Sequence, residues 1–245
     1  MSKTTHAVWK SESVAASYLD RKRSRPFLRE QIDVMLTVIK GVGGPVRHFM
    51  DLGCGDGILA AMILEEFPDS DGVLVDHSPP MLKAAEKELA GFARRIHLCE
   101  TDYGQEAWVE SIQQYAPVDL VVSGFSIHHQ PDARKHRIYA EIFQILRPGG
   151  MFINMEHVSS PTDRLSELWD QIRVDSLYEL AIQRKLNKTR AAVEKEYFER
   201  PDREANLFSP LDTQCDWLRE IGYTDVDCFF KYFELAVFGG RRPAV

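Results

Sequence analysis

A short glycine-rich stretch, from Asp51 to Gly57, constrains the fold of this chain more than any other feature. It reads DLGCGDG, so glycine occupies every second position, at 53, 55 and 57. An apolar run precedes the glycines, and a helix-forming run, ILAAMILEE, follows them. Glycine tolerates left-handed backbone conformations and lets another group approach the main chain, because it has no Cβ. The stretch therefore predicts a strand–turn–helix unit whose turn lies against a ligand.

Strand-like and helix-like segments alternate around this turn. The expected strands cover 45–52, 72–78, 94–102, 117–126 and 151–157. The expected helices between them cover 57–67, 79–92, 104–116 and 132–150. Such alternation predicts an α/β fold with a mostly parallel sheet that carries helices on both faces.

The alternation is absent at the N-terminus and late in the chain. Residues 6–44 read as helices only, and so do residues 160–209, after which one helix and two strands follow. We therefore expect an N-terminal helical arm over 1–45, an α/β core over 46–159, a helical cap insertion over 160–209, and the end of the core over 210–245.

The glycine turn does not match the two common nucleotide-binding fingerprints. A dinucleotide-binding turn needs G-x-G-x-x-G, and the third glycine position here is Ile58, which is β-branched. The chain also contains no G-x-x-x-x-G-K-[ST] sequence, so it lacks a P-loop.

The spacing D-x-G-x-G-x-G resembles motif I of the class I S-adenosyl-L-methionine (SAM)-dependent methyltransferases. The segments GVLVDHSPPML, CETDY, VDLVVSGFSIHH and ILRPGGMFI resemble later motifs of that family, in the family's order, so the likeness extends over about residues 46–240. It implies a Rossmann-like, doubly wound, seven-stranded sheet whose last strand is antiparallel. It also implies SAM as the cofactor, and in-line transfer of its methyl group to a small molecule.

The resemblance assigns cofactor-binding roles to particular residues. Asp76 would accept the ribose hydroxyls and Asp102 would meet the adenine amino group, although each could instead cap the helix that follows it. The residues that the resemblance places at the cofactor are Asp51, Gly53, Gly55, Asp56, Asp76, His77, Met81, Asp102, Tyr103 and Ser123. An N-terminal arm often closes over the cofactor in this family, which would add Tyr18 and Arg23. The arm's cations could equally form a solvated helix end.

Four titratable residues follow the fourth and fifth expected strands: His128, His129, Glu156 and His157. They are the candidate catalytic residues, because ligands of open α/β sheets bind beyond the carboxyl ends of the strands. An imidazole titrates near neutrality, so one histidine of the adjacent pair is the candidate base, with His128 preferred and His129 packed. Two histidines and a carboxylate could also bind a metal, but their spacing is not diagnostic and no metal is predicted.

The composition limits the partners. The formal net charge is −7, and the expected cap mixes both signs of charge, so nucleic acid and anionic membranes are poor partners. No apolar run approaches about 18 residues, so no membrane span is expected. The four cysteines form no C-x-x-C pair, which favours a reducing, cytoplasmic location. The sequence is compatible with a homodimer.

Two alternatives to a methyltransferase remain at this point. An enzyme that modifies the cofactor itself, similar to a carboxy-S-adenosylmethionine synthase, would need an extra cation near the methyl group. A non-catalytic cofactor-binding partner subunit would expose an apolar face on the cap. The cap itself, which contains Trp169, is either a lid over the acceptor or an ordinary packing layer.

Overall fold

The computed structural model describes residues 5–22 and 25–244. Its centre is a single sheet of seven strands in the order β3-β2-β1-β4-β5-β7-β6. The first five strands are parallel, and β7 runs antiparallel to both of its neighbours. The predicted doubly wound fold is therefore confirmed. The strands are β1 His48–Leu52, β2 Asp71–Asp76, β3 Ile96–Glu100, β4 Val118–Gly124, β5 Leu146–His157, β6 Thr224–Tyr232 and β7 Leu235–Arg241.

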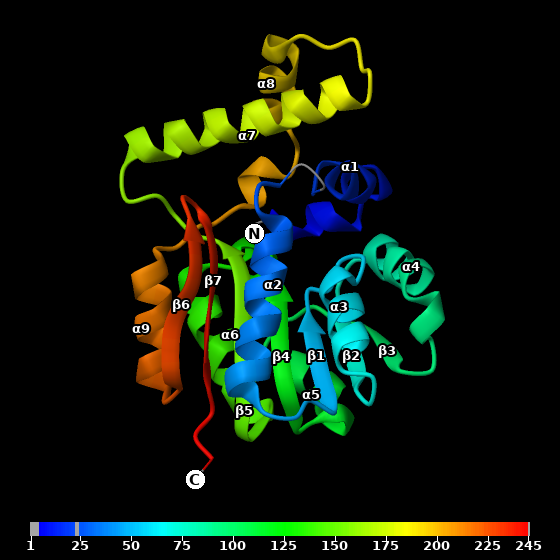
Figure 1. The fold of residues 1–245 in the computed structure, drawn as a ribbon, viewed down its shortest axis with the longest axis vertical. Coiled ribbons are helices and arrows are strands. Elements are labelled where there is room, and N and C mark those ends of the chain that lie inside the picture. Colours follow the sequence, from blue (N-terminus) through cyan, green and yellow to red (C-terminus); the bar gives the residue numbers. More distant parts are fainter. Residues whose placement is uncertain (1–4, 23–24, 245) are drawn as a thin grey trace.

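Helices cover both faces of this sheet (Figure 1). One face packs against α2 Leu28–Val38, α3 Ile58–Glu66 and α4 Pro79–Glu88. The other packs against α5 Trp108–Ile112, α6 Asp132–Ile145 and α9 Leu211–Ile221. Strands covered on both faces are buried along nearly their whole length, as the burial of β1, β2 and β4 shows. The helix α2 lies within the expected arm, yet it packs on β5, β6 and β7 as part of the core.

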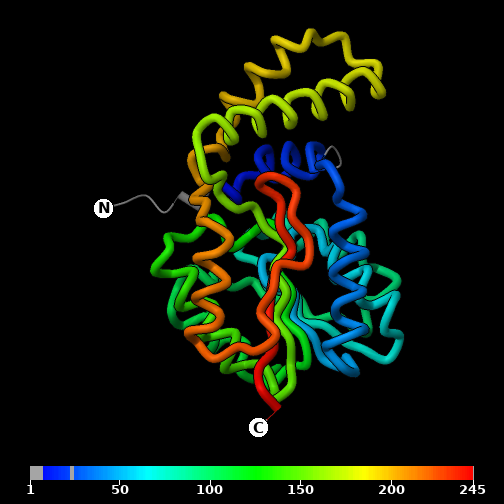
Figure 2. Tube along the Cα trace, turned by 60° about the vertical axis from the view of Figure 1, so that its left-hand side comes forward, coloured from blue at the N-terminus to red at the C-terminus, as the bar shows by residue number. Residues whose placement is uncertain are grey.

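The main helices of the arm and of the cap lie beyond the carboxyl ends of the parallel strands. They are the 3-10 helix Thr5–Lys10 and α1 Glu12–Lys22 of the arm, and α7 Asp163–Gln183 and α8 Arg190–Glu199 of the cap. Figures 1 and 2 show the yellow cap above the blue arm. Two ion pairs join them: Arg184 to Asp20 at 2.6 Å and Arg21 to Asp202 at 3.0 Å.

Two elements differ from the expected ranges. The helix expected over 104–116 is a short α5 followed by a 3-10 turn over Gln113–Tyr115. Strand β5 begins at Leu146 instead of Met151, so the segment RPGG enters the sheet. It does so through a shift of register opposite Val118 and Leu120, where Gly149 takes a φ of +80° that suits glycine. In the described parts of the chain, none of the helices is long and apolar enough to cross a membrane.

Candidate active site

Two adjoining cavities open beyond the carboxyl ends of the strands. We call the first the glycine-turn cavity, because the turn after β1, the end of β2 and the end of β4 line it together with the arm. We call the second the cap cavity; it holds about 310 Å³ between the arm, the cap and the loops after β4 and β5. The residues that line both cavities are Trp9, Tyr18, Lys22, Arg25 and His129. These five residues define the junction of the cavities.

The glycine turn lines the first cavity, and its three glycines serve different purposes. All three have left-handed φ values: +71° at Gly53, +56° at Gly55 and +79° at Gly57. A Cβ at Gly53 would lie 1.8 Å from the Oγ of Ser126, and one at Gly57 would lie 2.6 Å from a methyl of Leu89. A Cβ at Gly55 would meet nothing within 4 Å and would project from the cavity wall. The turn therefore packs closely on its neighbours through two glycines and keeps bare main chain at the third.

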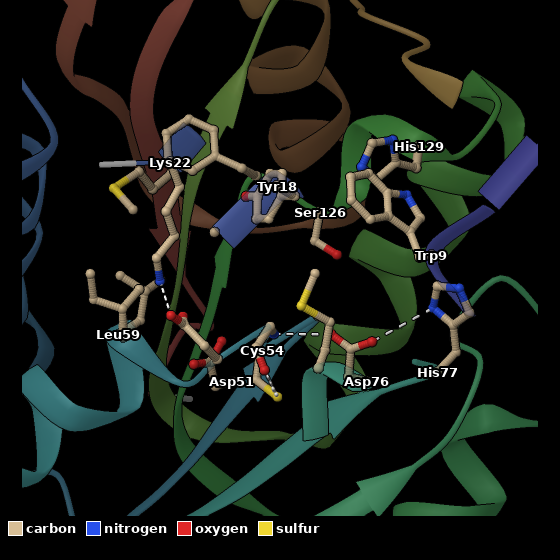
Figure 3. Close-up of a pocket in the computed structure, with 18 of the residues that line it drawn as sticks. Trp9, Tyr18, Lys22, Asp51, Cys54, Leu59, Asp76, His77, Ser126 and His129 are labelled. Carbon is tan, nitrogen blue, oxygen red and sulfur yellow. Dashed lines mark hydrogen bonds and ion pairs between the residues drawn. The ribbon is translucent and has the colours of Figure 1, made fainter. Parts of the chain in front are cut away.

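Asp76, at the end of β2, is held next to this turn (Figure 3). Its two carboxylate oxygens accept hydrogen bonds from Gly55 N and Ser78 N, each at 2.9 Å. Burial raises its pKa, while the two backbone N–H groups and His77 lower it. The carboxylate thus both organises the start of α4 and lines the cavity, so the capping role and the ligand role are compatible.

Asp51 is the less satisfied of the two buried acids. Its Oδ2 accepts from Ala60 N at 3.2 Å, at the start of α3, and its Oδ1 is buried with no hydrogen-bond partner among the described residues. Burial, and secondarily the charges of Asp76 and Asp56, raise its pKa to about 8. An unpartnered buried carboxylate oxygen in the cavity wall fits a cationic ligand group, such as the amino group of SAM.

This arrangement predicts that binding of the cofactor product S-adenosylhomocysteine (SAH) releases a proton at pH 7. Asp51, with a pKa near 8, is mostly protonated in the free protein, and a neighbouring ammonium group favours its ionised form. The affinity for SAH should therefore rise as the pH rises from about 6 to 8. Calorimetry of SAH binding in buffers of different ionisation enthalpy measures the released proton.

The Asp51→Asn variant should release no proton on binding SAH. The Asp119→Asn variant is the control, because Asp119 is also buried but lies at the start of β4, far along the strand from the cavity. Equal proton release by Asp51→Asn and the unmodified chain would contradict the assignment.

The other residues expected at the cofactor divide into two groups. Those that line the glycine-turn cavity are Tyr18, Gly53, Gly55, Asp56, His77, Met81 and Tyr103. Asp102 is not among the lining residues; its Oδ1 accepts from Gly104 N at 2.9 Å. Ser123 is fully buried and donates to Leu52 O at 2.7 Å, so Ser126, three residues later, lines the cavity in its place. Arg23 lies outside the described residues.

The arm closes the glycine-turn cavity from above. Lys22 of α1 forms an ion pair with Asp56 of the glycine turn. The carbonyl of Trp9 accepts from the Oγ of Ser78 at 2.6 Å, and the Trp9 ring packs with Met81. The arm is therefore bonded to both the turn and the start of α4, and cofactor exchange requires these contacts to open.

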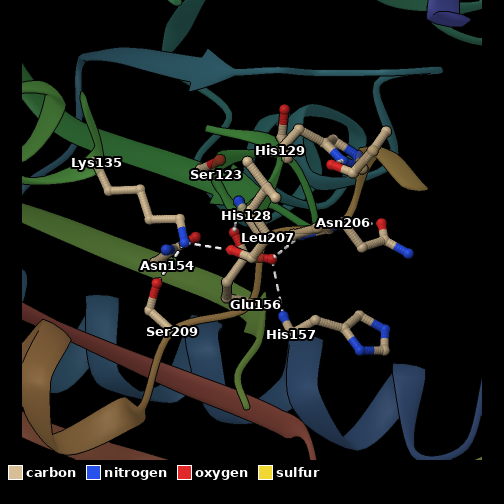
Figure 4. Close-up of polar contacts among 12 residues, drawn as sticks. Ser123, His128, His129, Lys135, Asn154, Glu156, His157, Asn206, Leu207 and Ser209 are labelled. Carbon is tan, nitrogen blue, oxygen red and sulfur yellow. Dashed lines mark hydrogen bonds and ion pairs between the residues drawn. The ribbon is translucent and has the colours of Figure 1, made fainter. Parts of the chain in front are cut away.

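Glu156 is the hub of the four candidate catalytic residues (Figure 4). It is buried and accepts from His128 N at 3.0 Å, from His128 Nδ1 at 2.5 Å and from His157 N at 2.8 Å. It lines neither cavity described above. His128 and His157 line the cap cavity, and the Nε2 of His128 lies 3.2 Å from the Oδ1 of Asn206. Glu156 thus lies outside both cavities and holds the loop after β4 and the ring of His128 in place.

His129 is placed differently from His128. It is the histidine that lies at the junction and therefore lines both cavities. Its Nδ1 lies 2.9 Å from the carbonyl of Ala205. A carbonyl only accepts, so the Nδ1 of His129 is the donor in this contact. The sequence expectation, with His128 as the base and His129 as the packed member of the pair, stays a prediction: His128 lines the cap cavity, and His129 is buried but also lines the junction.

Three features of the site were not found from the sequence. Ser126 and Trp9 at the first cavity, and the arginines Arg173 and Arg200 at the second, follow no motif. They come from the arm, the cap and a loop, and only the folded chain brings them together. Within residues 5–22 and 25–244, no group of three or more His, Cys, Asp or Glu side chains is arranged to hold a metal ion.

A family model described as a methyltransferase domain matches residues 49–150, which span β1 to the start of β5 and include the whole glycine turn. This part of the chain is a methyltransferase domain, in agreement with its resemblance to the class I SAM-dependent methyltransferases. The match, together with the methyltransferases among the similar proteins, supports an enzyme that uses SAM.

Several named proteins are similar to this methyltransferase. A carboxy-S-adenosyl-L-methionine synthase of Nautilia profundicola is 19% identical over 230 residues, 93% of this chain and 91% of its own. A trans-aconitate 2-methyltransferase of an Acidovorax species is 33% identical over 105 residues, but these are 43% of this chain and only 36% of the relative.

Solved structures share the fold. An O-methyltransferase family protein from Burkholderia thailandensis has a TM-score of 0.65 at 15% identity, covering 93% of this chain and 59% of that chain. Human N-acetylserotonin methyltransferase, solved in complex with SAM, has a TM-score of 0.62 at 16% identity, covering 99% of this chain. The methyltransferase described here spans 59% of each of these two solved chains.

Proposed function

We propose that this methyltransferase transfers the methyl group of SAM to a small molecule bound in the cap cavity. The observation that supports the proposal most strongly is the junction, where a cavity walled by the family's cofactor motif meets a second cavity of about 310 Å³. A methyl group at that junction would belong to a cofactor in the glycine-turn cavity and would face an acceptor in the cap cavity. When bound, SAM supplies a methyl group on a positively charged sulfur, so the protein has mainly to align, dry and deprotonate the acceptor.

The chain's own residues meet these needs. Asp76 and the bare main chain of Gly55 are placed to hold the ribose, and Asp51 is placed to hold the amino group of the cofactor. The arm lines both cavities and the cap lines the second, so together they would limit the access of water to the acceptor. His129 is our candidate base, because it is the histidine that lines both cavities. His128 and Glu156 hold the loop that carries it.

The primary test is calorimetry of SAH binding to the full chain, together with formation of SAH from SAM when small acceptors are added. Binding of SAH with a stoichiometry of one supports the cofactor site. SAH production that depends on an added acceptor supports methyl transfer to a separate molecule. Absence of SAH binding would contradict the whole proposal.

A cofactor-modifying activity is the second candidate, because Arg25 places a cation at the junction. Its guanidinium lies 3.5 Å from the centre of the Phe125 ring and lines both cavities. The similarity to a carboxy-S-adenosyl-L-methionine synthase extends over 93% of the chain. Mass spectrometry of the nucleoside that co-purifies with the chain separates the two. SAM or SAH favours a methyltransferase acting on an acceptor, and a carboxylated form of SAM favours the second candidate.

We predict that neither transfer RNA nor duplex DNA binds this chain in a salt-dependent way. The net charge is −7, and the cationic side chains of the cap cavity face inward, not along an open stripe. Binding through phosphates weakens steeply with added salt. Filter binding at about 50 mM and 200 mM salt measures this dependence. Tight binding that falls with salt would remove the case for a small-molecule acceptor.

A further inference from the structure

A lysine is buried at the start of α6, where a positive charge is not expected. Lys135 lies in the first turn of this helix, and its side chain is 1% exposed. Burying a charge costs free energy, and the helix dipole further disfavours a cation in the first turn. An uncharged side chain of similar length would pack there at lower cost. The contacts of the ammonium group should therefore explain its presence.

The ammonium group of Lys135 has three acceptors for its three N–H donors. It donates to the carbonyl of Leu207 and to the hydroxyl of Ser209, and it pairs with Asp132 at 3.0 Å. The Ser209 hydroxyl donates in turn to the same carboxylate at 2.5 Å. Burial acts to raise the pKa of Asp132, but the hydrogen bonds from Ser209 and Lys135 hold it below its ordinary value. Asp132 is therefore ionised at pH 7 and balances the buried ammonium charge.

The two other partners of Lys135 belong to residues 205–209, which lead from the cap to α9. We call residues 205–209 the return segment. Within it, Asn206 and Phe208 line the cap cavity. Lys135 lines neither cavity, yet it binds the neighbouring residues 207 and 209. It therefore holds one wall of the cap cavity from outside.

The return segment is also bonded to the two histidines of the loop after β4 (Figure 4). The carbonyl of Ala205 accepts from the Nδ1 of His129 at 2.9 Å. The Oδ1 of Asn206 lies 3.2 Å from the Nε2 of His128, and Leu207 N donates to His128 O at 2.9 Å. Three consecutive residues of the return segment thus contact the histidines, and Lys135 binds the third of them.

We propose that Lys135 is a positioning residue of the active site. It holds the return segment against the loop after β4, and thereby fixes the rings of His128 and His129 relative to the cap cavity. The inference rests on the proposed function, in which a histidine of this loop meets the acceptor. It adds a residue that touches neither the acceptor nor the cofactor. Such a residue can matter greatly, because a displacement of about 1 Å at a catalytic group can cost about a hundredfold in rate.

Other bonds should keep the return segment folded when Lys135 is replaced. The carbonyl of Ser209 accepts from Ser159 N at 3.0 Å and from the side chain of Gln214 at 3.1 Å. These bonds fix the end of the segment to the residues after β5 and to α9, but they do not reach residues 205–207. Loss of Lys135 should therefore loosen the contacts with the histidines without releasing the cap.

The test compares the unmodified chain with Lys135→Met by NMR, with and without SAH. Met has a similar length but no N–H donors. We expect the variant to lose the slowly exchanging Nδ1–H signal of the buried His129, because Ala205 is no longer held in place. Exchange of the Leu207 amide should become about tenfold or more faster. The affinity for SAH, measured by calorimetry, should be nearly unchanged, because Lys135 does not line the glycine-turn cavity.

Turnover gives a second readout that a merely structural role would not move. Formation of SAH from SAM is followed in the presence of small added acceptors. Lys135→Met should lower kcat by about tenfold to a hundredfold while leaving the KM for SAM nearly unchanged.

Two variants complete the comparison. Ser209→Ala is the milder one, because it removes one acceptor of Lys135 and keeps the bond to Leu207. It should change the same signals to a smaller extent, and it should add little to Lys135→Met, since both act on one contact. Tyr223→Phe is the control for lost stability, because it removes the buried hydrogen bond from Tyr223 to the carbonyl of Tyr139 in α6, at 2.9 Å. It should lower the melting temperature and leave the His129 signal and kcat unchanged.

Either of two results would overturn the inference. One is a folded Lys135→Met chain whose His129 signal and Leu207 exchange match those of the unmodified chain. The other is a changed His129 signal with unchanged kcat. If Lys135→Met does not fold, Ser209→Ala decides by the same two criteria. Failure of the unmodified chain to bind SAH would instead contradict the cofactor site, and the NMR comparison without SAH would still decide whether Lys135 holds the rings.

Discussion

Replacing His129 with Gln should lower kcat by about 10²–10⁴ while leaving the affinity for SAH nearly unchanged. Gln keeps a polar side chain of similar length, but it has no ring nitrogen that can take a proton. The reason for the choice is the position of His129 at the junction of both cavities, with its Nδ1 bonded to the carbonyl of Ala205. Turnover is followed as SAH release from SAM in the presence of small added acceptors.

The His128→Gln variant is the matched comparison. It removes the ring that lies 2.5 Å from the buried Glu156 carboxylate, so it should mainly lower the melting temperature. A measurement independent of any acceptor is 15N NMR of the histidine rings, which should show His129 protonated at Nδ1 and not at Nε2. If His128→Gln loses turnover and His129→Gln does not, the base is His128 after all.

Much of the fold follows from local features of the sequence. The glycines at 53, 55 and 57 mark the first strand–turn–helix unit, and the apolar segments that follow mark the order of strands and helices. These features are readable because each depends on neighbours in the chain: a left-handed turn needs glycine, and a strand covered on both faces is apolar throughout. The carboxylate of Asp76 was predictable for the same reason, since it ends a strand beside that turn.

The cap cavity was not predictable in this way. Arg25 follows the arm helix α1, Arg173 lies in the middle of α7, and Arg200 follows α8. In the sequence, each stands among charges of both signs and reads as a solvated surface residue. Only the docking of the cap over the arm turns these side chains inward, so their meeting in one cavity is a property of tertiary packing.

The sequence-based prediction of a cavity serine failed for an equally physical reason. Ser123 and Ser126 stand three residues apart, and the sequence offers no reason to prefer one. The structure buries Ser123 against the carbonyl of Leu52 within the sheet, because β4 continues to Gly124. Ser126 follows the end of that strand and faces the cavity, where its hydroxyl lies 2.5 Å from that of Tyr103. Which of two serines reaches a ligand thus depends on the residue at which the strand ends.

Replacing Asp76 with Ala should weaken SAH binding by about tenfold to a hundredfold, because it removes a carboxylate that can accept two hydrogen bonds from the ribose. The variant also leaves Gly55 N and Ser78 N without their acceptor, so the free protein should melt at a lower temperature. The Asp76→Asn variant is the milder companion: it keeps an acceptor oxygen of the same reach but carries no charge. Calorimetry with SAH, at a temperature well below melting, measures the affinity.

The control for this prediction is Asp71→Ala. Asp71 begins the same strand that Asp76 ends, and its exposed side chain pairs with His48 at 2.9 Å. It should change neither the affinity for SAH nor, by more than a small amount, the melting temperature, because exposed pairs contribute little. A purely structural Asp76 would produce the opposite pattern for its Ala variant, with a lowered melting temperature and unchanged SAH affinity. That pattern would leave the ribose without its acceptor, and the cofactor would then have to be held mainly by the glycine turn and Asp51.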